Sequence, residues 1–193
     1  MNRPNILRIG TVAALVLCWS VASAYAENGP TRERNPNDPT QNAKKDALEG
    51  KAPPALGNLT GWMNTVDGKP LAWADLKGKV ILIDFWGTWC PPCRRAIPHL
   101  KELSEKHADD GLIVLGIHTK NAEEEGPAYV REQKMEYPIA FDSKDNVISS
   151  FHVDGFPDYY LIDHKGILRF ADVANGDADR AVEILLEERK KDQ

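Results

Sequence analysis

The stretch Val80-Ile81-Leu82-Ile83-Asp84-Phe85-Trp86-Gly87-Thr88-Trp89-Cys90-Pro91-Pro92-Cys93 decides the fold of this chain. Its first half is a nearly continuous apolar run, which is typical of a strand that is buried on both faces of a sheet. The residues after Cys93 place apolar side chains at helical spacing, which predicts a helix. The two cysteines therefore stand where a strand ends and a helix begins.

A cysteine at a helix N-terminus is suited to redox chemistry. The unpaired backbone N–H groups there carry partial positive charge, so they lower the pKa of the Cys90 thiol and make it a nucleophile. Cys93, one turn on, can attack the resulting mixed disulfide and release the partner. Pro91 and Pro92 fit the first helical turn, where a missing N–H costs nothing. The sequence therefore predicts a redox couple.

Cysteine pairs with this spacing also occur in zinc sites and haem attachment sites. Structural zinc needs a second pair of ligands, and no cysteine follows Cys93. Haem attachment needs a histidine directly after the second cysteine, where this chain has Arg94. We expect no metal and no cofactor, and a non-catalytic metal- or partner-binding module is kept as an alternative. Five histidines are expected on the surface or in loops: His99, His107, His118, His152 and His164.

Beyond this stretch, predicted helices and strands alternate along the chain. The apolar run at 112–118 follows the helix predicted over 91–108, so its strand is expected to lie parallel to the strand at 80–86. The remaining elements are expected to be a helix over 123–134, a strand over 137–141, a helix over 144–151, a strand beginning near Pro157, a return strand over 167–173 and a helix over 177–190.

The segment Asp84–Cys93 resembles the active-site segment of the thioredoxin superfamily, and its Pro-Pro pair resembles the TlpA/ResA branch of extracytoplasmic thiol-disulfide oxidoreductases. Pro98 and Gly155-Phe156-Pro157 extend the resemblance, which runs from about Ala52 to the C-terminus. It implies an α/β thioredoxin fold: a central mixed sheet flanked by helices, with an N-terminal hairpin at about 58–71 and an insertion in the core.

The resemblance also assigns roles to residues around the cysteines. Asp84 matches a buried acid that exchanges protons with the second cysteine, and burial would raise its pKa and suit it to act as a base. A hydrogen bond that anchors the strand end is the alternative role. Pro157 matches a cis-proline, which leaves the Phe156 backbone to pair with an extended substrate chain. Trp89 is expected to shield the site, and the two prolines between the cysteines to tune the redox potential.

One position near the predicted site departs from the family pattern. The family usually has Thr after the cis-proline, but this chain has Asp158. We expect its negative charge to lie near the thiolate, where it would raise the pKa of Cys90 and disfavour acidic partners.

The first 26 residues are typical of a secretory signal peptide. Arg3 and Arg8 precede an uncharged, mostly apolar stretch, and Ala24-Tyr25-Ala26 is an A-x-A cleavage pattern. An uncleaved membrane anchor is the alternative. Residues 27–51 lack the apolar content of a folded segment, so we predict a disordered linker. This leaves residues 52–193 as the thioredoxin-like domain.

The net charge and the predicted signal peptide limit the partners and the location of this protein. Cleavage after Ala26 removes two arginines and no acid, so the net charge changes from −5 to −7, which argues against nucleic acid or anionic membrane partners. We expect a periplasmic or otherwise extracytoplasmic monomer that reduces disulfides of exported proteins. The resemblance implies a membrane electron donor and a use in cytochrome c maturation.

Two other enzyme activities are kept as alternatives. One is a DsbA-like disulfide donor. The other is a thiol peroxidase, which needs a Thr-x-x-Cys arrangement, and Thr88 is too close to Cys90 to supply it.

Overall fold

The computed structural model describes residues 29–120 and 125–193. The predicted signal peptide at residues 1–26 lies outside this part. Within the described ranges, no helix is both long and apolar enough to cross a membrane.

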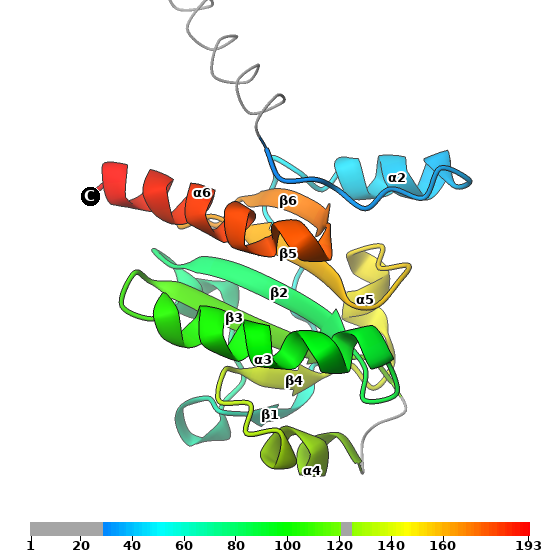
Figure 1. Cartoon of the computed structure of the whole chain (residues 1–193), viewed down its shortest axis with the longest axis vertical. Helices are drawn as coiled ribbons and strands as arrows, with labels where there is room; N and C mark the ends of the chain where they lie inside the picture. Colours follow the sequence, from blue (N-terminus) through cyan, green and yellow to red (C-terminus); the bar gives the residue numbers. More distant parts are fainter. Residues whose placement is uncertain (1–28, 121–124) are drawn as a thin grey trace, which may run out of the picture.

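A six-stranded mixed sheet forms the centre of the protein, in the order β1-β4-β3-β2-β5-β6 (Figure 1). Its strands are β1 (Thr60–Met63), β2 (Val80–Trp86), β3 (Leu112–His118), β4 (Ile139–Phe141), β5 (Asp158–Ile162) and β6 (Leu168–Val173). β2 pairs in parallel with β3, as predicted, and antiparallel with β5. The bounds of β2 and β3 agree with those expected from the two apolar runs.

Helices cover both faces of this sheet. They are α2 (Pro39–Asp46), α3 (Pro91–Lys106), α4 (Glu125–Glu132), α5 (Asn146–Ser150) and α6 (Ala178–Lys191), with short 3-10 turns η1 (Val66–Gly68), η2 (Trp73–Leu76) and η3 (Asn175–Asp177). Figure 1 shows α3 and α6 on the near side of the sheet. The predicted insertion supplies α4 and β4, and β4 joins the sheet between β1 and β3.

Strand β2 is buried on both faces because each face packs into a separate apolar cluster. Val80, Leu82 and Trp86 pack with the inner sides of α3 and α6, in the cluster that also contains both cysteines of the predicted redox pair. Ile81 and Phe85 pack into the other cluster, together with apolar residues of α5 and β5. Alternate residues of β2 therefore lie on opposite faces, and the even-numbered ones share a face with the redox pair.

The N-terminal hairpin expected at 58–71 is not formed as a strand pair. β1 pairs antiparallel with β4 instead. The expected return segment at 69–71 lies outside any strand, between η1 and η2. Pro70 in this segment has no N–H to donate to a neighbouring strand, which explains the difference.

Residues 29–51 are folded onto the domain, so the prediction of a disordered linker is wrong for this part. Arg32 forms a β-bridge with Val173, and Lys51 forms one with Leu168, so the segment runs beside β6. Figure 1 shows α2 beside the β6 edge of the sheet. The prediction failed because the segment is held by hydrogen bonds and ion pairs, which apolar content does not reveal.

Candidate active site

The cysteine pair lies at the N-terminus of α3, where the sequence predicts it. Cys90 is the N-cap residue, and Cys93 lies in the first turn. The two form a disulfide, and each is 2% exposed. The backbone N–H of Cys93 donates to Sγ of Cys90 over 3.2 Å. In the reduced protein this N–H and the helix N-terminus can stabilise a thiolate at Cys90.

A loop that ends at β5 faces the cysteine pair. The Phe156–Pro157 peptide bond is cis, as predicted. The carbonyl oxygen of Phe156 lies 3.4 Å from Sγ of Cys90. The ring of Trp89, which is 57% exposed, meets the Phe156 ring edge to face at 5.5 Å between centroids. Phe156 therefore contacts Sγ of Cys90 through its backbone carbonyl and the exposed Trp89 through its ring.

Asp84 lies on the face of β2 that carries the cysteines. Its side chain is buried, and its Oδ1 has no hydrogen-bond partner among the described residues. Burial raises the pKa of Asp84 to about 8. A carboxyl group with this pKa can accept or donate a proton near neutral pH, which is the requirement for general acid–base work.

His118 is a site residue that sequence reasoning missed. It was expected on the surface or in a loop, but it is fully buried at the end of β3. The backbone N–H of Thr88 donates to Nε2 of His118 over 2.8 Å, and Nδ1 lies 2.5 Å from the carbonyl oxygen of Thr119. The imidazole therefore fixes the loop that leads to Cys90. The position of His118, at the end of an apolar strand parallel to β2, is the signal that could have revealed it.

Asp158 does not present a free negative charge to Cys90, so that expectation is wrong. Its side chain is 3% exposed, and its Oδ2 lies 3.3 Å from Nζ of Lys45 on α2. Burial, together with the neighbouring charge of Asp172, raises the pKa of Asp158. The residue after the cis-proline therefore belongs to an internal charge cluster.

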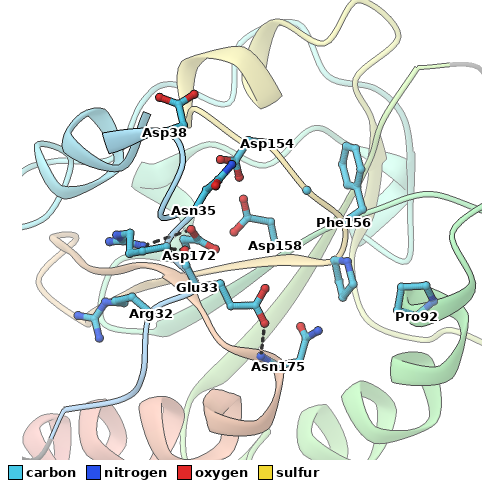
Figure 2. A pocket seen from close by; sticks show the side chains of 13 residues that line it. Arg32, Glu33, Asn35, Asp38, Pro92, Asp154, Phe156, Asp158, Asp172 and Asn175 are labelled. Atoms are coloured by element: carbon cyan, nitrogen blue, oxygen red, sulfur yellow. Dashed lines mark hydrogen bonds and ion pairs between the residues drawn. The ribbon is translucent and has the colours of Figure 1, made fainter. Parts of the chain in front are cut away.

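A cavity of about 690 Å³ lies beside the cis-proline loop. Figure 2 shows its walls: the N-terminal segment on one side, the loop around Phe156, and Pro92 from α3. A second cavity, of about 490 Å³, is bordered by Thr88, Trp89 and residues of α4. Within the described ranges, no group of three or more His, Cys, Asp or Glu side chains is placed to hold a metal ion.

Comparisons with known sequences agree with this geometry. The model of the AhpC/TSA family matches residues 50–171. The protein DipZ of Mycobacterium tuberculosis is 39% identical over 129 residues, which is 64% of this chain but 19% of DipZ. The thiol-disulfide oxidoreductase ResA of Bacillus cereus is 32% identical over 101 residues, which is 52% of this chain and 58% of ResA. The chain thus spans about a fifth of DipZ and less than two thirds of this ResA.

Solved structures share the fold. The thioredoxin domain of a thiol-disulfide oxidoreductase from Bacteroides vulgatus is 26% identical and aligns over 72% of this chain and 97% of that chain, with a TM-score of 0.62. A thiol:disulfide interchange protein of the thioredoxin family from Chlorobium tepidum is 30% identical and aligns over 70% of this chain and 96% of that chain, with a TM-score of 0.57.

Proposed function

This chain belongs to the AhpC/TSA family, and from this premise we propose that it is a thioredoxin-like oxidoreductase that reduces disulfides of exported proteins through Cys90 and Cys93. The observation that carries the proposal is the placement of Sγ of Cys90 at a helix N-terminus, 3.4 Å from the carbonyl oxygen of Phe156. A nucleophile and a backbone acceptor for an extended chain therefore lie side by side.

The reaction has two steps. The Cys90 thiolate attacks one sulfur of the substrate disulfide, which forms a mixed disulfide and releases one substrate thiolate. Cys93 then loses its proton and attacks Sγ of Cys90, which forms the Cys90–Cys93 disulfide and releases the second substrate thiolate. The substrate gains two electrons, and the cysteine pair loses them. Two protons, one taken from Cys93 and one from the solvent, end on the substrate thiols.

Two residues are proposed to support these steps. Asp84, whose pKa burial raises to about 8, is proposed to accept the proton of Cys93 and to pass it on. The carbonyl of Phe156, next to Pro157, is proposed to accept a hydrogen bond from the substrate backbone. These roles are supported by the burial of Asp84 and by the contact between Phe156 and Cys90.

The oxidised pair must be reduced again after each turnover. We therefore propose a thiol-based electron donor at the membrane and an extracytoplasmic location, in line with the signal-peptide pattern at residues 1–26. The resemblance to the TlpA/ResA branch supports cytochrome c apoproteins as one substrate class. We propose that the protein acts as a monomer.

The reduction potential of the pair tests the direction of electron flow. The purified protein is equilibrated with defined thiol buffers, and the fluorescence of Trp86 and Trp89 reports its redox state. A reductase is expected near the thioredoxin value of about −270 mV, whereas a value near about −120 mV would make the protein a disulfide donor. The proposed substrate class is tested by incubating the reduced protein with a disulfide-bonded CxxCH peptide and measuring its thiols.

A further inference from the structure

Lys45 of α2 is the most deeply buried cation in the described part of the chain, with 1% of its surface exposed. Its Nζ contacts three carboxylates: Asp154, Asp158 at 3.3 Å and Asp172 at 2.7 Å. Burial alone would lower the pKa of Lys45, but the three carboxylates outweigh it and raise the pKa. The ammonium group therefore stays charged at neutral pH, and the mechanism above gives it no role.

Two of these contacts lie at the ends of the cis-proline loop. Asp154 comes two residues before Phe156, and Asp158 comes two residues after it. A single ammonium group thus holds both ends of a five-residue loop whose central carbonyl faces Sγ of Cys90 at 3.4 Å. Figure 2 shows Asp154 and Asp158 close together on the loop that carries Phe156.

We propose that Lys45 is a positioning residue for substrate binding: it clamps Asp154 and Asp158 and so fixes the Phe156 carbonyl opposite Cys90. This inference rests on the proposed function, because it assigns the clamped loop to substrate binding. It also makes residues 29–51 part of the active site, since the same segment forms one wall of the cavity beside the loop.

The charge balance explains why the loop depends on this lysine. The carboxylates outnumber the ammonium group, and Arg34, 3.2 Å from Asp172, supplies a second cation to the cluster. Buried charges of one sign are costly unless they are paired. Without Lys45, Asp154 loses its ammonium partner, and Asp158 faces the like charge of Asp172 unopposed, so Asp158 moves away or takes up a proton. Either change shifts the loop and with it the Phe156 carbonyl.

The test compares Lys45→Met with the wild-type protein and with Lys69→Met. Lys69 is a matched control because it is exposed and pairs with the exposed Asp67. Two substrates are used: a disulfide-bonded peptide, which needs the Phe156 carbonyl, and a small aromatic disulfide, which needs only the Cys90 thiolate. For Lys45→Met we expect kcat/KM for the peptide to fall about tenfold because KM rises. We expect kcat/KM for the small disulfide to change less than about twofold.

Equal rates for Lys45→Met and wild type on the peptide would overturn the clamp, as would equal slowing on both substrates. If Lys45→Met does not fold, Asp154→Asn takes its place, because it frees one end of the loop and Asp154 is 35% exposed. This variant is expected to slow the peptide reaction about threefold, and an unchanged rate would overturn the clamp.

A second readout does not depend on activity. Amide hydrogen exchange in residues 154–158 is expected to be faster in Lys45→Met, or in Asp154→Asn, than in wild type and Lys69→Met. Unchanged exchange would overturn the clamp even in an inactive protein. A wild-type protein that reduces neither disulfide would instead refute the proposed function.

Discussion

The backbone N–H of Thr88 donates a 2.8 Å hydrogen bond to Nε2 of His118. His118 lies in register with Trp86 across the parallel β2–β3 pair, and their rings meet edge to face at 4.6 Å between centroids. Because Nε2 accepts from Thr88 and Nδ1 faces the Thr119 carbonyl, the imidazole is neutral with its proton on Nδ1. One buried side chain thus connects the end of β3 to the loop that carries Cys90.

We expect His118→Phe to loosen this loop, because the substitution leaves the Thr88 N–H without an acceptor. The free energy of unfolding should fall by about 1 kcal/mol, the lower end of the cost of an unsatisfied donor, because the Thr88–His118 bond is only partly buried. Urea denaturation measures this loss. His99→Phe, at a half-exposed position on α3, is the control. An unfolding free energy equal to that of wild type would show that the Thr88–His118 bond does not stabilise the loop.

The same histidine should make stability depend on pH. Burial lowers the pKa of His118 below its ordinary value of 6.5, despite the Thr119 carbonyl and Asp145, which favour the charged form. The unfolded chain therefore binds a proton near pH 6.5 that the folded protein does not bind, so the stability present above pH 6.5 is lost as the pH falls. The free energy of unfolding is measured by urea denaturation between about pH 7.5 and pH 5, a range that spans the ordinary pKa of histidine. It should decline less for His118→Gln than for wild type.

Asp84 should destabilise the protein as the pH rises. Its pKa is about 8 in the folded protein against 3.8 as the ordinary value. Because the folded pKa is the higher one, the stability is fully present below pH 3.8 and is lost as the pH rises through about 8. At pH 7 we expect Asp84→Asn to raise the free energy of unfolding by about 4 kcal/mol.

Urea denaturation at several pH values checks this expectation, with the exposed Asp109→Asn as control. The difference between Asp84→Asn and wild type should grow with pH and then level off above about pH 8. A difference that is constant with pH would mean that Asp84 carries no raised pKa.

The proposed role of Asp84 in catalysis predicts a separate effect. Without a base, Cys93 loses its proton more slowly, so Asp84→Asn should slow the release of substrate from the mixed disulfide by about 100-fold at pH 7. The attack by Cys90 should be nearly unchanged. Stopped-flow tryptophan fluorescence in a single turnover separates the two steps. If release is as fast in Asp84→Asn as in wild type, Asp84 has only a structural role.

The sequence was most informative where apolar pattern alone determines the structure. β2 and β3 have the predicted bounds because each is a run of apolar residues that enters the core from a charged or glycine-containing turn. The position of Cys90 and Cys93 follows from the end of β2 and the start of α3. These features depend on neighbouring residues in the chain, so periodicity and capping rules are sufficient to locate them.

The sequence was least informative where distant polar groups meet. Lys45 lies more than a hundred residues before Asp154 and Asp158, and nothing local in residues 29–51 indicates that they pair. The Thr88–His118 bond likewise joins residues 30 positions apart. Such contacts need the tertiary structure, because polar residues follow no periodicity that distinguishes a solvated segment from an anchored one.

Variants of the two cysteines should separate attack from release. Cys90→Ser removes the proposed nucleophile, so turnover should be abolished, while the far-UV circular dichroism should match that of wild type under reducing conditions. Cys93→Ser keeps the nucleophile but cannot resolve the mixed disulfide, so it should accumulate a covalent complex with a disulfide-bonded peptide, which intact-mass spectrometry detects. Since Cys90 is the N-cap residue of α3 and its Sγ lies next to the Phe156 carbonyl, attack should occur at Cys90 only. A covalent complex formed by Cys90→Ser would reverse the assigned order of the two thiols.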